Sequence, residues 1–143
     1  MVDTQTHVCR VSLNAKIYRD LEIVSTKRLY DLAGAIVRAF QFDFDHAFGF
    51  YSKLTGNIYD SPVKYELFAD MADSDARSVK QSRIAEAFPE VGAKMTFLFD
   101  YGDDWRFRVE IIGRNLKEPG VKYPRLLKSI GTAPEQYPEL DDE

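Results

Sequence analysis

The chain has 143 residues, of which 45% are hydrophobic and 29% are charged, and its formal net charge is −4 at pH 7. This length and composition are typical of one soluble globular domain and exclude a disordered chain, while the mild negative charge argues against bulk nucleic-acid binding. The single cysteine excludes an internal disulfide, and the lack of a signal pattern or a bilayer-length apolar run predicts a cytoplasmic protein that does not contact a membrane.

The first 24 residues predict a β-hairpin. Apolar and polar residues alternate on both sides of Asn14-Ala15-Lys16, a period that is typical of two strands joined by a turn. The alternating apolar positions are Cys9, Val11, Leu13, Ile17, Leu21 and Ile23. Because Cys9 falls on this apolar face, we expect it to be buried as a small hydrophobic residue. His7 precedes the clearest alternation, and we expect it in a loose N-terminus.

Residues 25–40 predict one amphipathic helix. Apolar side chains recur at intervals of three and four residues, at Leu29, Leu32, Ala33, Ile36, Val37 and Phe40. Ser25 or Thr26 can accept hydrogen bonds from the first amides of this helix. Gly34, in its middle, lowers helix stability by about 1 kcal/mol relative to alanine, and the missing side chain would let the helix lie close to a sheet.

The next segment, residues 48–52, alternates again, with Phe48 and Phe50 on one face. Hairpin, helix and strand in this order resemble the β-β-α-β ubiquitin-like roll. We therefore expect an α+β fold in which one main helix packs on a mixed sheet and a C-terminal β-hairpin extends the roll. Residues 60–82 show little periodicity and predict an irregular excursion. A short helix is expected over residues 83–88, with Ser82 as its cap and Pro89 at its end.

Residues 95–111 carry the clearest hairpin pattern of the chain. One apolar face comprises Met95, Phe97, Phe99, Tyr101, Trp105, Phe107, Val109 and Ile111. A loop of three residues, 102–104, would place Tyr101 opposite Trp105 on that face. The same register would place Asp100 opposite Arg106 on the other face, so that hydrophobic burial and charge pairing agree.

The loop of this hairpin allows two interpretations. Its carboxylates can accept the backbone amides of the turn, while Gly102 adopts a backbone angle that other residues resist and Trp105 donates its indole N–H to a nearby acceptor. Alternatively, the carboxylates could bind a hard cation together with His46, or Asp103 could act as a general base, although the spacing is not that of a calcium loop. The candidate functional residues are Asp100, Gly102, Asp103, Asp104, Trp105 and His46. No set of catalytic residues is complete, so we expect no cofactor and no resident metal. Enzymatic activity is the alternative to a non-catalytic role.

The charge changes sign along the C-terminal part of the chain. Residues 114–128 contain five bases and one acid, whereas residues 135–143 contain five acids and no base. Such a segment can bind an external anion or fold back on itself. If the anion is a nucleic acid, the candidate binding residues are Lys122, Arg125 and Lys128. We expect a single domain over residues 1–143, with an ordered core of about residues 7–115 and a charged C-terminal segment at 116–143.

Three stretches, covering roughly residues 8–138, together resemble the plasmid Ri ORF-three-like family, whose members are also described as passenger proteins of insertion elements. "FDYGDDWRFRVEI" resembles the family motif Y-D-F-G-D-x-W. "LYDLAGAIVRAFQFDFDHAFGFY" is similar to the family's helix, aromatic turn, His and following strand. "YPRLLKSIGTAPEQYPE" is similar to the C-terminal segment of one subgroup. The residues that stand on family positions are Asp100, Gly102, Asp103, Trp105 and His46.

The chain also departs from the family pattern. Tyr101 replaces the usual Phe, Phe107 stands where many members have His, and the region around Ala133 lacks the cysteine-containing ending of other members. A metal role for that ending therefore cannot transfer to this chain. The resemblance implies a mixed α/β fold of prokaryotic origin and no established reaction.

Two functions are compatible with this sequence. The first is a non-catalytic interaction module of a prokaryotic, mobile-element-associated protein, which binds a protein partner or, by family analogy, a nucleic acid. The alternative is a metal-dependent hydrolase or nucleic-acid-acting protein centred on the Asp-rich hairpin. Nothing in the sequence selects an oligomeric state.

Overall fold

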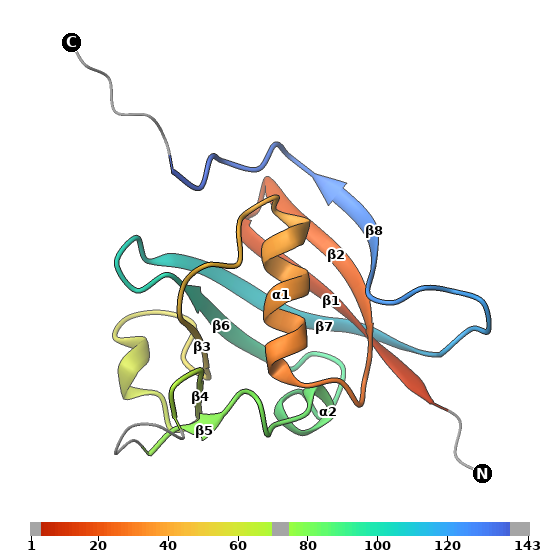
Figure 1. Cartoon of the computed structure of the whole chain (residues 1–143), viewed down its shortest axis with the longest axis horizontal. Coiled ribbons are helices and arrows are strands. Elements are labelled where there is room, and N and C mark those ends of the chain that lie inside the picture. Colours follow the sequence, from red (N-terminus) through yellow and green to blue (C-terminus); the bar gives the residue numbers. More distant parts are fainter. Residues whose placement is uncertain (1–3, 70–74, 138–143) are drawn as a thin grey trace.

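One main helix packs against an eight-stranded sheet in the computed structural model, which describes residues 4–69 and 75–137 (Figure 1). The strands are β1 (Gln5–Asn14), β2 (Ile17–Val24), β3 (Phe48–Tyr51), β4 (Lys64–Glu66), β5 (Arg77–Ser78), β6 (Lys94–Phe99), β7 (Trp105–Leu116) and β8 (Arg125–Ile130). The helices are α1 (Leu29–Ala39), α2 (Ile84–Ala87) and the 3-10 helix η1 (Ile58–Asp60). No helix within the described ranges is long and apolar enough to cross a membrane.

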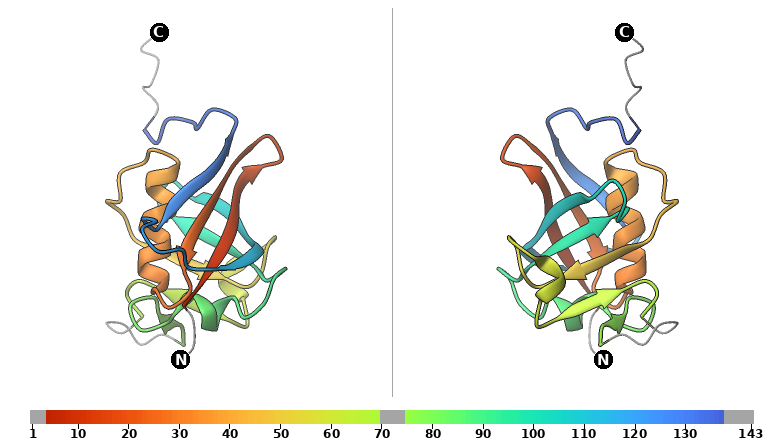
Figure 2. Two further views of the ribbon diagram at one scale, coloured as in Figure 1. Left: turned by 90° about the vertical axis from the view of Figure 1, so that its right-hand side faces the viewer. Right: turned by 90° about the vertical axis from the view of Figure 1, so that its left-hand side faces the viewer.

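The strands hydrogen-bond in the order β5-β4-β3-β6-β7-β1-β2-β8. Within the described residues, β4 and β5 pair in parallel and the other neighbours pair antiparallel, so the expected α+β class with a mixed sheet is confirmed. The ubiquitin-like arrangement is not confirmed. After α1 the chain enters β3, which pairs with β4 and β6, and β6 and β7 separate β3 from β1 (Figure 2). The predicted C-terminal hairpin therefore forms the centre of the sheet.

The N-terminal hairpin forms as predicted. Cys9 pairs with Leu21 across β1 and β2, and both side chains are buried against α1 and the core. Burial raises the pKa of the Cys9 thiol to about 12, so this cysteine is an inert apolar residue at neutral pH. In the turn, the Asn14 side-chain oxygen accepts a hydrogen bond of 2.9 Å from the amide of Lys16.

His7 was expected in a loose N-terminus, but it lies inside β1 and its side chain is fully buried. Its Nδ1 atom lies 2.7 Å from the Ser25 hydroxyl, and its Nε2 atom lies 2.8 Å from the backbone oxygen of Phe88. The polar imidazole can be buried because both of its nitrogens find hydrogen-bond partners in two distant segments of the chain. Alternation of apolar residues therefore could not reveal the start of β1.

Helix α1 forms where the apolar stripe predicts it. Its buried side chains include Leu29, Leu32, Ala33, Ile36 and Val37. The expected cap by Ser25 or Thr26 does not form, because the helix begins at Leu29 with Arg28 at its N-cap position, and the Ser25 hydroxyl bonds His7 instead. The carboxylate of Asp31, in the first turn, accepts a hydrogen bond of 3.1 Å from the backbone amide of Arg28. A residue of the helix itself thus provides a partner for a free amide at the helix N-terminus.

The core between α1 and the sheet is built largely from phenylalanine rings. Phe97, at the centre of β6, is fully buried. Its ring centroid lies 4.8–6.3 Å from four other rings, those of Phe48, Phe50, Phe99 and Phe107. Because these rings come from β3, β6 and β7, Phe97 ties three central strands into one packed unit.

The β6–β7 hairpin is confirmed, but its register differs from the prediction by two residues. Trp105 pairs with Phe99 and not with Tyr101. The turn takes the five residues 100–104, because Asp100 and Asp104 adopt positive φ angles of 63° and 57° and so end the ladder at Phe99. A shift by an even number keeps every strand side chain on its predicted face, so the apolar face still enters the core.

Two further regions differ in detail from the expectation. The sheet extends past the predicted end of the core near residue 115, because β8 pairs with β2. The short helix α2 forms, but the Ser82 hydroxyl donates to the backbone oxygen of Ser78 rather than capping the helix. The irregular segment 60–82 contains the short strands β4 and β5, and its residues 70–74 lie outside the described ranges.

Candidate functional site

Asp100 organises the turn of the β6–β7 hairpin. Its Oδ1 atom accepts hydrogen bonds from the amides of Gly102, at 3.1 Å, and Asp103, at 3.3 Å. Its backbone oxygen accepts a further bond of 2.6 Å from the amide of Asp104. The side chain is only 9% exposed, and its carboxylate accepts backbone amides of the turn, which is the first of the two interpretations of the sequence.

The predicted pairing of Asp100 with Arg106 is wrong. Arg106 instead binds the neighbouring Asp104, with 2.9 Å between Nε and Oδ1. Asp100 faces His46, whose Nε2 atom lies 3.3 Å from Oδ2. The register shift explains the exchange, because Leu98 rather than Asp100 stands opposite Arg106 in the ladder.

His46 lies in a group of polar side chains that we call the tip cluster, which comprises Asp45, His46, Asp100 and Tyr137. The Tyr137 hydroxyl lies 2.5 Å from His46 Nε2 and donates a hydrogen bond of 3.0 Å to Asp45 Oδ2. Partial desolvation, the bond to Asp45 and the negative charges of the nearby aspartates raise the pKa of Tyr137 to about 12. At neutral pH Tyr137 is therefore a neutral hydroxyl that links the imidazole to a carboxylate.

The C-terminal segment is held against this cluster by a second residue. The Gln136 side chain accepts a bond of 2.7 Å from the amide of Asp43 and donates one of 3.1 Å to the backbone oxygen of the same residue. Asp45 and Tyr137 were not predicted as site residues, because contacts between residues 92 positions apart leave no local pattern. One feature of the sequence could have pointed to Tyr137, namely the Gln136-Tyr137 pair inside the C-terminal stretch that resembles the family.

The opposite side of the turn carries a tyrosine pair. The Tyr101 hydroxyl lies 2.8 Å from that of Tyr51, which in turn donates to Glu66 at 2.5 Å. Burial raises the pKa of both tyrosines, that of Tyr101 to about 12. Gly49 leaves room for this contact, since a Cβ atom there would lie 2.9 Å from the Tyr101 hydroxyl.

The expected hydrogen bond of Trp105 does not form with any described residue. Its Nε1 atom is buried without a partner there, while the ring packs edge-on against Phe42 with 4.9 Å between centroids. Trp105 is thus a packing residue at the end of the apolar face of the hairpin.

The geometry of the Asp-rich hairpin separates its carboxylates. Asp100 points toward His46, Asp104 toward Arg106, and Asp103 is exposed. Among the described residues, no three His, Cys, Asp or Glu side chains converge in a way that could hold a metal ion. An open hollow of about 370 Å³ borders Asp45 and His46.

The basic candidates lie on and before β8, away from the tip cluster. Arg125 binds Glu22 with 2.8 Å between Nη2 and Oε1, although the Glu22 side chain is only 1% exposed. Burial alone would raise the pKa of Glu22, but hydrogen bonds from Thr6, Arg125 and Asn115 lower it below its ordinary value. Arg125 is therefore a structural ion-pair partner rather than a free cation.

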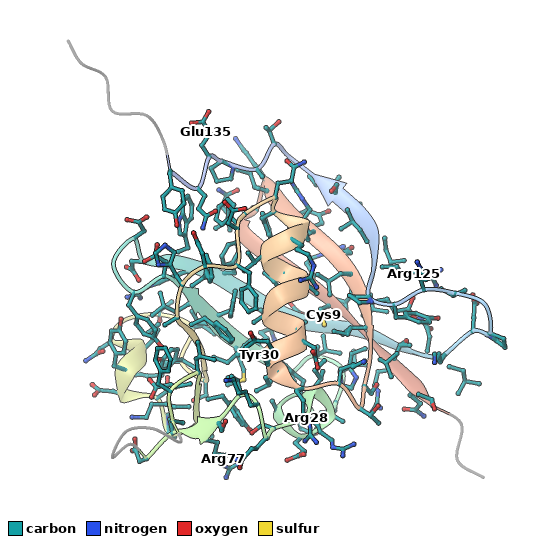
Figure 3. All side chains as sticks on the ribbon, in the orientation of Figure 1. Cys9, Arg28, Tyr30, Arg77, Arg125 and Glu135 are labelled. Carbon is teal, nitrogen blue, oxygen red and sulfur yellow. The ribbon has the colours of Figure 1, made fainter. Side chains whose placement is uncertain are left out.

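The other two basic candidates differ from Arg125. Lys128 lies over the ring of Tyr18, with 5.7 Å from Nζ to the centroid, and Lys122 is exposed. Glu135, the first acid of the tail, lies at a separate place from Arg125 on the surface (Figure 3). The remaining acids of the tail, from residue 138 onward, lie outside the described residues, so the folding of the acidic tail back onto the basic stretch stays a prediction.

Comparison with known proteins finds a matching family and a solved structure with a related fold. A family model described as plasmid pRiA4b ORF-3-like protein matches residues 5–137. A crystal structure of a protein of unknown function from Methanosarcina mazei Go1 superimposes with a TM-score of 0.72 at 18% identity, over 92% of this chain and 72% of that one. This likeness concerns the fold alone. No curated protein matches the sequence.

Proposed function

The chain belongs to the plasmid pRiA4b ORF-3-like family, and we propose that it acts in this family as a non-catalytic interaction module that binds a partner protein. Support comes from the polar groups of the hairpin turn. Asp100 is engaged by turn amides and His46, and Asp104 is engaged by Arg106. These groups stabilise the turn, and of them only His46 lines the open hollow nearby, so they do not form a catalytic set around that hollow.

The partner surface that we propose is the edge of the sheet formed by β8, which pairs on one side only among the described residues. β8 is the last strand on one side of the sheet, whereas the opposite end is β5, with two residues. The apolar side chains of β8 are well exposed: Leu126 by 52%, Leu127 by 45% and Ile130 by 37%. An edge strand of six residues with this character can pair with an extended segment of another chain.

The charge beside this edge favours an acidic partner segment. Residues 119–134 contain three bases and no acid. Glu22 neutralises Arg125, so Lys122 and Lys128 dominate the surface beside the edge. Pairing with a second copy of β8 would place two positively charged surfaces side by side, which is less favourable than pairing with an acidic segment. These charges favour a different protein as the partner, one whose extended segment alternates apolar and acidic residues.

Selection of displayed random peptides on the full chain tests this function. We expect the enriched peptides to alternate apolar and acidic residues and to bind with an affinity that Leu127→Lys lowers about tenfold or more, because one anchor at the edge is lost. Leu54→Lys is the matched control, since Leu54 is 40% exposed and lies outside β8. The variant Asp103→Asn should keep its fold and bind the same peptides.

Two outcomes would contradict the module. Either no peptide is enriched, or enriched peptides bind the Leu127→Lys variant as well as the original chain. A metal-dependent rise in melting temperature that is lost in Asp103→Asn would instead favour the hydrolase, with the hollow beside His46 as its substrate site.

A nucleic acid is the alternative partner for the basic surface. The residues that support it are Lys122 and Lys128, because Arg125 is already engaged by Glu22. Binding of this kind should weaken steeply with salt and on neutralising the two lysines, whereas peptide pairing through backbone hydrogen bonds should depend less on salt. The cytoplasmic, prokaryotic and mobile-element setting, and any closer kinship to the ubiquitin-like roll, stay predictions.

A further inference from the structure

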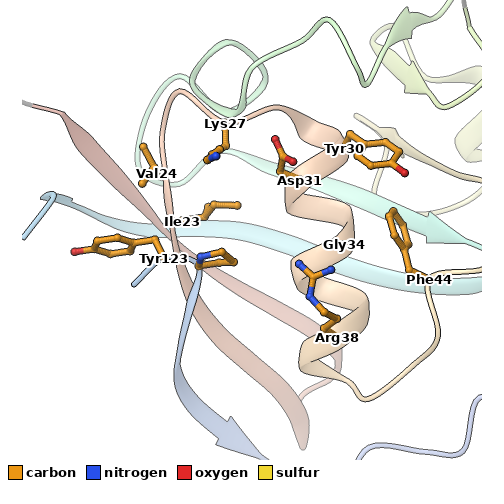
Figure 4. A pocket seen from close by; sticks show the side chains of 10 residues that line it. Ile23, Val24, Lys27, Tyr30, Asp31, Gly34, Arg38, Phe44 and Tyr123 are labelled. Carbon is orange, nitrogen blue, oxygen red and sulfur yellow. The ribbon is translucent and has the colours of Figure 1, made fainter. Parts of the chain in front are cut away.

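A hollow of about 240 Å³ lies between α1 and the segment that leads into β8 (Figure 4). It is separate from the tip cluster and from the outer edge of β8, so it does not depend on the proposed function. Its lining residues are Ile23, Val24, Lys27, Tyr30, Asp31, Gly34, Arg38, Phe44, Tyr123 and Pro124. Pockets for drug-sized ligands measure roughly 300–1,000 Å³, so this hollow suits a smaller, single-ring molecule.

Gly34 keeps the helix side of the hollow open. A Cβ atom at this position would lie 3.1 Å from Arg38 Nη1 and 3.5 Å from a ring carbon of Phe44. The backbone of α1 does not need glycine there, because residue 34 lies inside a regular helix. The missing side chain thus costs helix stability, about 1 kcal/mol relative to alanine, and leaves space in the hollow beside the guanidinium group.

The charges of the hollow favour an anion. Within residues 4–69 and 75–137, neither the Lys27 side chain nor that of Arg38 makes a hydrogen bond or an ion pair. The one acid, Asp31, already accepts the amide of Arg28 at the start of α1. Among the described residues, two side-chain cations without a partner, Lys27 and Arg38, therefore line the hollow together with one carboxylate, that of Asp31, which already accepts a hydrogen bond.

The remaining walls favour a flat apolar body. Ile23, Phe44 and Pro124 contribute apolar surface, and Tyr30 and Tyr123 contribute aromatic rings (Figure 4). We propose that this hollow binds a small aromatic carboxylic acid, with the carboxylate on the Arg38 guanidinium group and the ring against the apolar wall, while Lys27 adds positive charge at the other end of the hollow. Arginine suits this role because its planar guanidinium group can bind both carboxylate oxygens at once.

Titration of the full chain with benzoate, followed by amide chemical shifts in NMR, tests the proposal. We expect shifts confined to residues 23–38, 44 and 123–124, and an affinity about fivefold higher for benzoate than for the neutral benzamide. Arg38→Gln should remove this preference. Arg108→Gln is the matched control, because Arg108 lies on β7 outside the hollow and should leave both affinities unchanged.

Gly34→Ala supplies a second, independent variant. It should keep or raise the melting temperature, because alanine favours the helix, while it weakens benzoate binding by filling the hollow. The proposal is overturned if benzoate and benzamide bind alike, if the shifts map elsewhere, or if both Arg38→Gln and Gly34→Ala bind benzoate as well as the original chain.

Discussion

At the scale of single residues, His7 makes the folded state sensitive to acid. Burial lowers the pKa of His7 below its ordinary value of 6.5, the hydrogen bond to Phe88 opposes this change, and the charge of Arg114 adds to it. The unfolded chain therefore takes up a proton here more readily than the folded chain. The free energy of unfolding is unaffected above about pH 6.5 and falls as the pH drops toward the folded-state pKa.

We predict that His7→Gln removes this component of the pH dependence. Urea unfolding from about pH 5 to pH 7.5 measures it, and only the slope with pH is compared, because the substitution also changes the baseline stability. Equal slopes for the two chains would show that His7 is not the group responsible.

Gly131 is a second single-residue constraint, at the end of β8. Its φ angle is +78°, and a Cβ atom there would lie 2.3 Å from the backbone oxygen of Lys16. Gly131→Ala should lower the free energy of unfolding by more than about 2 kcal/mol, because both backbone strain and a clash with rigid backbone oppose the methyl group.

Gly120→Ala is the control for that substitution. Gly120 has the same φ of +78°, but a Cβ atom there would meet no other atom within 4 Å, so only the strain of about 1–2 kcal/mol applies. Chemical denaturation of both variants separates the two effects, and equal losses would contradict the predicted clash.

At the scale of elements, the Glu22–Arg125 ion pair attaches β8 to the sheet. Arg125→Gln leaves the Glu22 carboxylate buried without its charged partner, and we expect the free energy of unfolding to fall. The loss is moderated because the Arg125 side chain is 37% exposed and partly screened by water.

The effect should concentrate in β8. Hydrogen exchange of residues 125–130 should accelerate in Arg125→Gln, and adding Glu22→Gln should restore part of the stability by removing the unpaired charge. Because the pKa of Glu22 is lowered from 4.5, the contribution is present above about pH 4.5 and is lost as the pH falls through the folded-state pKa. A double variant no more stable than the single one would contradict this account.

The β6–β7 turn is held by one carboxylate. Asp100→Asn should cost less stability than Asp100→Ala, because asparagine tolerates the positive φ of 63° and its side-chain oxygen can still accept the turn amides. We expect the alanine variant to lose about 1–2 kcal/mol more in thermal or urea unfolding. Equal losses of stability in Asp100→Asn and Asp100→Ala would contradict this account. They would mean that Asp100 stabilises the fold through its negative charge beside His46 rather than through its hydrogen bonds to the turn amides.

At the scale of the whole molecule, the phenylalanine core joins strands from distant parts of the chain. Phe97→Ala should lower the free energy of unfolding by about 3–5 kcal/mol, because it opens a cavity among four packed rings. Phe68, which is 53% exposed, provides the control, and Phe68→Ala should change stability by less than about 0.5 kcal/mol. A comparable loss in both variants, measured by urea unfolding, would contradict the assignment of the core.

Much of the fold could be predicted from particular residues. The apolar stripe of Leu29, Leu32 and Ile36 predicts α1, and the alternation around Phe97 and Phe107 predicts the central hairpin and its buried face. For the candidate site, the structure brings two of the candidate residues together, with 3.3 Å between His46 Nε2 and Asp100 Oδ2, and their functional role stays a prediction. The predicted partner of Asp100, Arg106, was wrong. The three-residue loop on which that prediction rested did not allow for the left-handed φ angles that Asp100 and Asp104 adopt in the turn.

The sequence by itself determined which side of each strand and helix is buried, because that periodicity depends only on the local geometry of the backbone. The tertiary structure alone decided the strand order, the length of the hairpin turn, the burial of His7 and the contact of Tyr137 with His46. Each of these depends on which distant surfaces pack together and on which buried polar groups find partners. Such choices are settled by the free energy of the whole assembled core, so no short stretch of residues encodes them.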